Sequence, residues 1–169
     1  MNRNPELFTE AVEYAAAGGH VDLTTSTTPV FLAEGEVKCS AGLKRLLDAG
    51  VPAGRVSFSS DGQGSMPDFD GNGRFTGLTI GRCASLWPEV VDAVREEGIP
   101  LETALQVITS SPADHYRLPR KGHVAVGMDA DFVLVDRETF AIRTVVARGQ
   151  VMVKDGRPVV FGTFEKSGK

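Results

Sequence analysis

The sequence is poor in the residues that usually build metal and redox sites. It has two cysteines, Cys39 and Cys83, and three histidines among its 169 residues. The cysteines lie far apart and match no zinc-ribbon or redox spacing, so we predict reduced, partly buried thiols. The histidines form neither a His-x-His pair nor an i, i+4 pair, the spacings that let neighbouring side chains hold a metal ion. By themselves they indicate no metal site.

Long apolar runs and strongly basic stretches are also missing. No segment approaches the ~18 consecutive apolar residues of a membrane-spanning helix, and residues 1–5 do not resemble a signal peptide. We therefore predict a cytoplasmic protein that contacts no membrane. The 18 Lys and Arg against 22 Asp and Glu give a net charge of −4, and the only basic cluster spans residues 117–121. This balance disfavours DNA and RNA as partners.

The first sixty residues alternate between helical and strand patterns. Asn4 before a proline is typical of a helix start, and the apolar spacing that follows predicts a helix that stops at Gly18. Residues 20–25 and 55–60 are predicted strands, and residues 34–49 are a predicted helix between them. The order helix, strand, helix, strand predicts that the two strands pair in parallel.

The pattern changes twice further along the chain. The glycine-rich residues 62–73 are predicted to form a long loop. Helical segments are predicted at 80–97, 101–109 and 112–116, and short strands at 131–136, 142–147, 151–153 and 158–161. The dipeptide Asp155-Gly156 is a hairpin signal between two of these strands. The chain is therefore expected to have an α/β segment, residues 1–117, and a β segment, residues 118–169.

Asp61 is the strongest candidate for a catalytic residue. It directly follows a predicted parallel strand, at the end where α/β barrels place their catalytic groups, and it precedes glycines that let a ligand approach the backbone. A carboxylate in this place can be a metal ligand, a general base or a residue that forms an Asx turn. Position alone slightly favours the turn.

The nearby small residues fit no nucleophile or nucleotide motif. The run Gly62-Gln63-Gly64-Ser65-Met66 lacks the second glycine of a nucleophile elbow, the lysine of a P-loop and the third glycine of a dinucleotide fingerprint. Ser65 can still hydrogen-bond a substrate. Arg3 could bind an anion through its guanidinium, or it could be an exposed arginine in a frayed terminus, which position alone favours.

Several segments resemble the isoaspartyl (β-aspartyl) dipeptidases of the amidohydrolase superfamily. The most specific are residues 59–65 (SSDGQGS) and 2–4 (NRN), followed by residues 19–24 (GHVDLT). Residues 127–134 and 147–156 resemble the β tail that is general to the superfamily. The segments occur in the family's order and cover essentially the whole chain, but only the C-terminal part of the family's enzyme.

The resemblance implies a fold, a reaction and roles for three residues. The chain would be the C-terminal part of a metal-dependent amidohydrolase (β/α)8 TIM barrel, followed by the C-terminal strands of a small β-sandwich. The family hydrolyses dipeptides that are linked through the aspartate side chain, using two zinc ions. Asp61 would touch the metal and transfer the proton, whereas Arg3 and Ser65 would bind the substrate.

The sequence departs from the family pattern at the metal site. The His-x-His pair, the bridging modified lysine or acid and two further histidines are missing, and ~250 residues are needed for a complete barrel. We therefore expect a truncated piece of the enzyme, which associates with itself or with the missing N-terminal part. The alternatives are a non-catalytic, partner-dependent α/β module with an orphaned Asp61, or another amidohydrolase, such as a dihydroorotase-like enzyme or an N-acyl-amino-acid deacylase.

Overall fold

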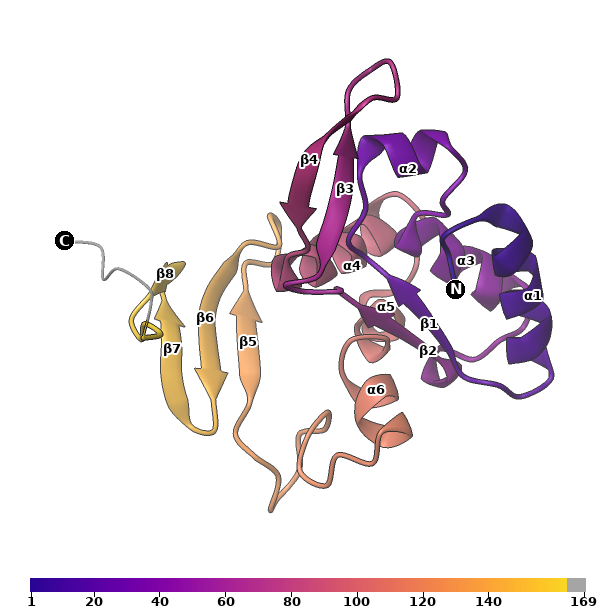
Figure 1. Cartoon of the computed structure of the whole chain (residues 1–169). Coiled ribbons are helices and arrows are strands. Elements are labelled where there is room, and N and C mark those ends of the chain that lie inside the picture. The colour runs from indigo at the N-terminus through magenta and orange to yellow at the C-terminus, as the bar shows by residue number, and fades with distance from the viewer. Residues whose placement is uncertain (164–169) are drawn as a thin grey trace. The chain divides into compact units, whose positions relative to one another are not determined.

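The computed structural model describes residues 1–163, which form two compact units that meet between residues 118 and 119 of the sequence (Figure 1). The helices of the first unit are α1 (Pro5–Ala16), α2 (Pro29–Ala33), α3 (Cys39–Asp48), α4 (Leu86–Arg95), α5 (Leu101–Gln106) and α6 (Ser110–His115). Its strands are β1 (Val21–Thr24), β2 (Val56–Ser59), β3 (Ser65–Phe69) and β4 (Phe75–Ile80). The first unit therefore has the mixed α/β content that the sequence predicts.

The second unit is an antiparallel sheet with the strand order β5-β6-β7-β8. Its strands are β5 (Phe132–Val135), β6 (Ile142–Ala147), β7 (Gln150–Lys154) and β8 (Arg157–Pro158). The predicted turn Asp155-Gly156 is confirmed, because both residues have positive φ angles, 50° and 73°, as a tight hairpin turn requires. The last predicted strand is shorter than expected, and the end of the predicted β segment, residues 164–169, lies outside the described residues.

The parallel pairing of β1 and β2 is confirmed and forms the centre of the first unit. Val21 pairs with Val56, and Thr24 pairs with Ser59, so the two strands end at the same level. The alternate side chains on one face, such as Leu23, are fully buried against the helices. This apolar face fixes the strands, and their common carboxyl end presents the residues that follow them.

The helix predicted over 34–49 is wrong in its first turn. The short helix α2 ends at Ala33, before the predicted helix begins, and α3 begins only at Cys39. Gly35 adopts a φ angle of +104°, a left-handed conformation that ends α2 and that other residues rarely adopt. The chain then turns so that the Glu36 side chain is buried, which an uninterrupted helix would not do.

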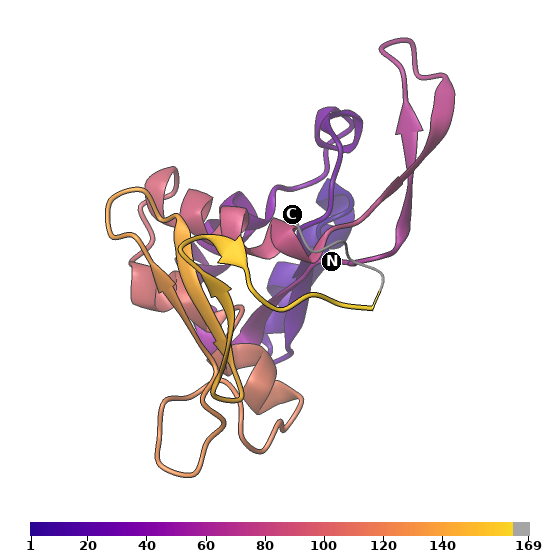
Figure 2. The ribbon, with the colours of Figure 1, turned by 90° about the vertical axis from the view of Figure 1, so that its left-hand side faces the viewer.

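The long loop predicted over 62–73 is also wrong, because this region folds as the β3–β4 hairpin (Figure 2). Asp70 forms the turn, since its carboxylate accepts the backbone N–H groups of Asn72 and Arg74, each at 2.9 Å. Gly73 has a φ angle of +74° in the same turn. The prediction failed because Pro67 and several glycines, which usually interrupt strands, are tolerated in a two-stranded hairpin whose edges need no partner.

The later helices differ from the prediction in their bounds. Residues 80–97 begin in β4, pass through a 3-10 turn at Cys83–Ser85 and become α-helical only over α4. The segment predicted over 101–109 ends at Gln106, and α6 begins at Ser110, two residues before the prediction. The pairing of Ile80 with Ser65 in the hairpin explains the first difference, because strand pairing and helix formation compete for the same backbone groups.

The prediction for the cysteines is half correct. Cys39 is a free, buried thiol, and burial together with the nearby carboxylates raises its pKa, so it stays protonated. Cys83 is also free but exposed, so its predicted burial is wrong. None of the helices within residues 1–163 combines the length and the apolar character needed to cross a membrane.

Candidate functional site

The site lies where β1 and β2 end, and the buried side chain of Asn2 fixes one side of it. Its amide nitrogen donates to the carbonyl oxygens of Thr24 (3.1 Å) and Val37 (2.9 Å), and its amide oxygen accepts the Thr24 N–H (2.8 Å). Asn2 is 1% exposed. The segment before α1 is therefore tied to the end of β1 and to the approach to α3, and Arg3 follows directly.

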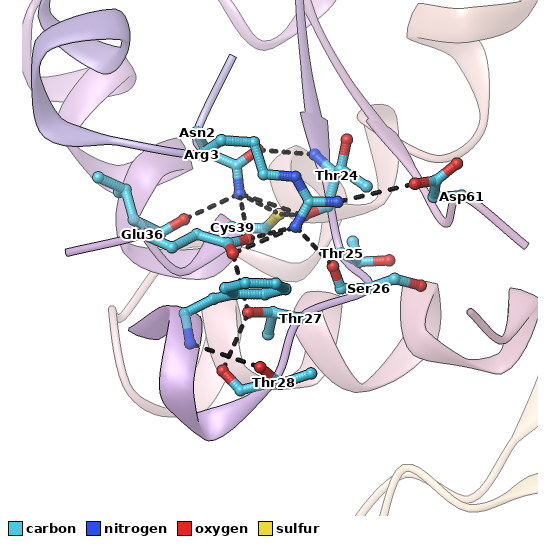
Figure 3. Close-up of polar contacts among 12 residues, drawn as sticks. Asn2, Arg3, Thr24, Thr25, Ser26, Thr27, Thr28, Glu36, Cys39 and Asp61 are labelled. Atoms are coloured by element: carbon cyan, nitrogen blue, oxygen red, sulfur yellow. Dashed lines mark hydrogen bonds and ion pairs between the residues drawn. The ribbon is translucent and has the colours of Figure 1, made fainter. Parts of the chain in front are cut away.

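Glu36 holds the Arg3 side chain in one orientation (Figure 3). Nη1 of Arg3 donates to both carboxylate oxygens of Glu36, at 3.0 and 3.1 Å, and to the Ser26 carbonyl oxygen at 2.9 Å. The Thr27 hydroxyl donates to the same carboxylate at 3.0 Å. The Glu36 side chain is only 2% exposed, against 36% for Arg3. Arg3 is therefore exposed, as one alternative predicts, but its side chain is anchored rather than frayed.

The other guanidinium nitrogen of Arg3 faces Asp61. Arg3 Nη2 lies 3.7 Å from Asp61 Oδ2, which is the distance of an ion pair, and the Asp61 side chain is 58% exposed. Among residues 1–163, the Asp61 carboxylate accepts no backbone N–H. Its side chain therefore does not form the Asx turn that is one of the alternatives. The structure thus brings two of the three candidate residues together, and it leaves the Asp61 carboxylate accessible.

Backbone packing holds Asp61 in its unusual conformation. Its φ angle is 47°, in the left-handed region that aspartate tolerates better than most residues. A Cβ atom added to Gly81 would lie 2.4 Å from the Asp61 carbonyl oxygen, and one added to Gly64 would lie 2.9 Å from it. These two positions therefore require glycine, because any side chain would displace the strand end or the hairpin that begins beside it.

Ser65 occupies a different place from Arg3 and Asp61. It is the first residue of β3, is exposed and pairs with Ile80 across the hairpin. Within the described part of the chain, no contact joins it to either of the other two candidates. Its role in binding substrate remains a prediction.

The described residues do not form a complete metal centre. No group of three or more His, Cys, Asp or Glu side chains within residues 1–163 could hold a metal ion. The histidines contribute elsewhere, since His20 stacks on His115 with ring centroids 3.7 Å apart and contacts the Ser57 hydroxyl at 3.1 Å. Asp61 could supply one oxygen ligand, so a metal site here would need further ligands from outside the described residues.

The hairpin and the segment after β1 enclose a cleft of about 390 Å³ beside this site. One side is the hydroxyl-rich run from Thr25 to Pro29, and the other includes Met66 and Ile80 of the hairpin and the following Arg82. Sequence reasoning missed Glu36 and Arg82 because both were assigned to predicted helices, over residues 34–49 and 80–97. The repeated hydroxyl residues after a strand were the only local signal of this cleft.

Comparison with known proteins places these features in a family. The sequence pattern of the amidohydrolase family matches residues 13–154. The allantoinase of Deinococcus radiodurans is 31% identical over 159 residues, which cover 83% of this chain and 36% of the allantoinase. The adenine deaminase of Nitratidesulfovibrio vulgaris is 44% identical over 64 residues, which cover 37% of this chain and 11% of that enzyme.

A solved structure resembles nearly the whole chain. It is the β-aspartyl dipeptidase of the thermophilic, keratin-degrading Fervidobacterium islandicum AW-1, in complex with a β-Asp-Leu dipeptide. It is 36% identical, with a TM-score of 0.80, over 98% of this chain and 41% of the dipeptidase. The chain thus spans less than half the length of these relatives. Since the family pattern covers most of the sequence, the chain belongs to the amidohydrolase family.

Proposed function

We propose that this chain provides the carboxylate and the arginine of an active site that hydrolyses β-aspartyl dipeptides. The observation that supports it is the pairing of Arg3 with Asp61 at the common end of two parallel strands. The likeness to a β-aspartyl dipeptidase over 98% of the chain supports the choice of substrate. In this proposal, the first unit is part of a (β/α)8 barrel and the second is part of a β-sandwich.

In this proposal, Asp61 transfers the proton and Arg3 binds the substrate. Asp61 is exposed and can accept a proton from the water that attacks the β-carbonyl carbon, which forms the new C–O bond. It then gives this proton to the amide nitrogen as the C–N bond breaks, so the products are aspartate and a free amino acid. Arg3 is held by Glu36 and can bind a substrate carboxylate, and Ser65 can assist as a hydrogen-bond donor.

The proposal includes zinc, but this chain would contribute only Asp61 to its coordination. The remaining ligands would come from protein outside the chain, either a longer polypeptide or a partner. Within the described residues, the β1–β2 sheet has two strands, so no third strand pairs with either outer edge. Such a sheet favours association with another polypeptide or with a second copy of the chain. Light scattering of the purified chain gives its oligomeric state, and sequencing the DNA upstream of the Met1 codon shows whether an in-frame extension encodes a His-x-His pair.

The experiment is a substrate panel with measured zinc content. β-Asp-Leu should be hydrolysed by the chain, or by the longer polypeptide if the upstream DNA encodes one, and Asp61→Asn should lower kcat by about 10²–10⁴-fold. Asp48→Asn, an exposed carboxylate on α3, is the matched control and should keep full activity. Turnover with near-stoichiometric zinc supports the proposal, whereas no zinc and no turnover supports the non-catalytic alternative.

A second candidate is a different amidohydrolase reaction. The 31% identity to an allantoinase over 83% of the chain favours including cyclic amides in the panel. Allantoin, dihydroorotate, adenine and an N-acyl amino acid should therefore be tested beside β-Asp-Leu. Turnover of one of these compounds without turnover of β-Asp-Leu would replace the proposed substrate but keep the hydrolase.

A further inference from the structure

The cleft beside Arg3 and Asp61 contains a second arginine, Arg82, that the proposed reaction has not used. Arg82 directly follows Gly81, which packs against both strand ends: an added Cβ atom would lie 2.4 Å from the Asp61 carbonyl oxygen and 3.0 Å from the Ser26 hydroxyl. The Gly81 N–H also donates to the Gly64 carbonyl oxygen at 2.9 Å. The backbone of Arg82 is therefore fixed next to the candidate site.

The guanidinium of Arg82 differs from that of Arg3 in having no partner within residues 1–163. Arg3 donates to a buried carboxylate and to a carbonyl oxygen. Only the carbonyl oxygen of Arg82 is used, by the N–H and hydroxyl of Ser85 at 3.0 and 2.8 Å. Arg82 is exposed and lines the cleft. Its donors are thus available to a ligand that enters there.

Three hydroxyl groups of the cleft already donate to protein acceptors. The hydroxyls of Thr25, Ser26 and Thr27 donate to the carbonyl oxygens of Ser59 and Ser60 and to the Glu36 carboxylate. Each therefore presents mainly acceptor capacity to a ligand. An anion in the cleft would find its charged donor in Arg82.

The Asp68 carboxylate also lines the cleft and accepts the Phe69 N–H at 3.0 Å. It would repel an anion placed against it, so it favours binding of the anion at the Arg82 side. The apolar side chains of Met66 and Ile80 lie along the same cleft. The cleft therefore combines a cationic hydrogen-bond donor, which can bind an anion, with apolar walls. This combination suits an amino acid that has a free carboxylate and an apolar side chain.

A β-aspartyl dipeptide carries two carboxylates, one on the aspartate and one at the C-terminus of the second residue. We propose that Arg82 binds this C-terminal carboxylate and that the cleft receives the second residue, which leaves as a free amino acid. This inference rests on the proposed function, since it assigns the second anion of that substrate. It makes Arg82 a specificity-determining residue that selects dipeptides over longer or amidated chains.

The kinetic test pairs two substrates with two variants in the active polypeptide. β-Asp-Leu and its C-terminal amide differ only in the charge that Arg82 would bind. In the unmodified protein, the amide should have a kcat/KM about 10–100-fold lower, the effect expected for one hydrogen-bonded charge pair. Arg82→Met should cause a similar loss with β-Asp-Leu, mainly through KM, and little change with the amide. Arg74 lies at the tip of the same hairpin, and Arg74→Met should leave kcat/KM unchanged for both substrates.

A binding test on the full 169-residue chain separates this inference from the proposed reaction. N-Acetyl-leucine and N-acetyl-leucinamide are titrated into ¹⁵N-labelled protein, and the Arg82 Nε–H signal is assigned by its absence in Arg82→Met. A saturable shift with the acid, at least tenfold weaker with the amide, supports the inference even if β-Asp-Leu is not hydrolysed. Equal responses to acid and amide, or binding that survives Arg82→Met, would overturn it.

Discussion

The carboxyl ends of β1 and β2 meet at the same site but are built in opposite ways. At the end of β1, the polar groups are buried and mutually hydrogen-bonded: Asn2 is 1% exposed and the Glu36 side chain 2%. At the end of β2, the Asp61 side chain is 58% exposed, and the backbone alone is held tightly. The β1 end is therefore the structural side of the site, which orients Arg3. The β2 end is the open side, where the Asp61 carboxylate can contact a substrate.

This difference also explains why the two sides should respond differently to mutation. A buried polar group that loses a hydrogen-bond partner keeps its desolvation cost, whereas an exposed carboxylate is solvated with or without a neighbour. Substitutions at the β1 end should therefore change the free energy of unfolding. Substitutions of the Asp61 side chain should change chemistry with little effect on folding.

The largest effect is expected for Asn2→Ala. This change removes the side-chain bonds to Thr24 and Val37 and leaves their backbone groups without these partners. We expect the free energy of unfolding to fall by about 3 kcal/mol in urea denaturation. Asn72→Ala, at the exposed hairpin turn, is the control and should cost less than about 0.5 kcal/mol. Equal values for the two variants would contradict the structural role of Asn2.

A more direct comparison neutralises one carboxylate on each side. Glu36→Gln keeps the shape of the side chain but removes the charge and one of the two acceptor oxygens that hold Arg3. We expect a loss of about 1–3 kcal/mol in the free energy of unfolding. Asp61→Asn should stay within about 0.5 kcal/mol, because its side chain is exposed and asparagine tolerates the same positive φ angle.

Urea unfolding of both variants under the same conditions tests this pair. A cost for Asp61→Asn as large as that for Glu36→Gln would show that the open side also stabilises the fold. It would then be unsafe to interpret a loss of activity in Asp61→Asn as a loss of chemistry. The comparison therefore also serves as the stability control for the proposed function.

Local patterns in the sequence were enough to predict the parallel pair and the start of α1. Asn4 accepts the Leu7 N–H at 2.7 Å, as its cap position before a proline predicts. The hairpin was missed because its strand signal is weak: Pro67 and the glycines argue against pairing, and tertiary contacts decide the outcome. Gly35 was missed because a single glycine within an apolar pattern does not by itself end a helix.

The site was only partly predictable for a similar reason. The end of a strand identified Asp61, and the resemblance identified Arg3, but no local pattern joins them. Their 3.7 Å approach depends on the buried contacts of Asn2 and Glu36, which lie 34 residues apart in sequence. Such long-range partners follow from packing, so a single sequence without its fold could not reveal that Glu36 orients Arg3.

The smallest effect concerns the opposite, amino end of the same two strands, where His20 links β1 to β2. The Ser57 hydroxyl donates to Asp22 at 2.6 Å, so His20 Nε2 must donate its proton to the Ser57 oxygen at 3.1 Å. Burial, followed by the neighbouring His115 and then Arg55, lowers the pKa of His20, although Asp22 opposes the shift. The folded protein therefore binds this proton less readily than the unfolded chain does.

It follows that His20 makes folding depend on pH. The stability should be greatest above the ordinary histidine pKa of about 6.5 and should fall as the pH drops through that value toward the lower pKa of the folded state. Burial raises the pKa of Glu89, which gives a slope of the opposite sign. Urea unfolding at neutral and mildly acidic pH should therefore be compared between the unmodified chain and His20→Gln, because the Glu89 contribution cancels in the difference. If the free energy of unfolding has the same pH dependence in both proteins, protonation of His20 does not affect the stability of the fold.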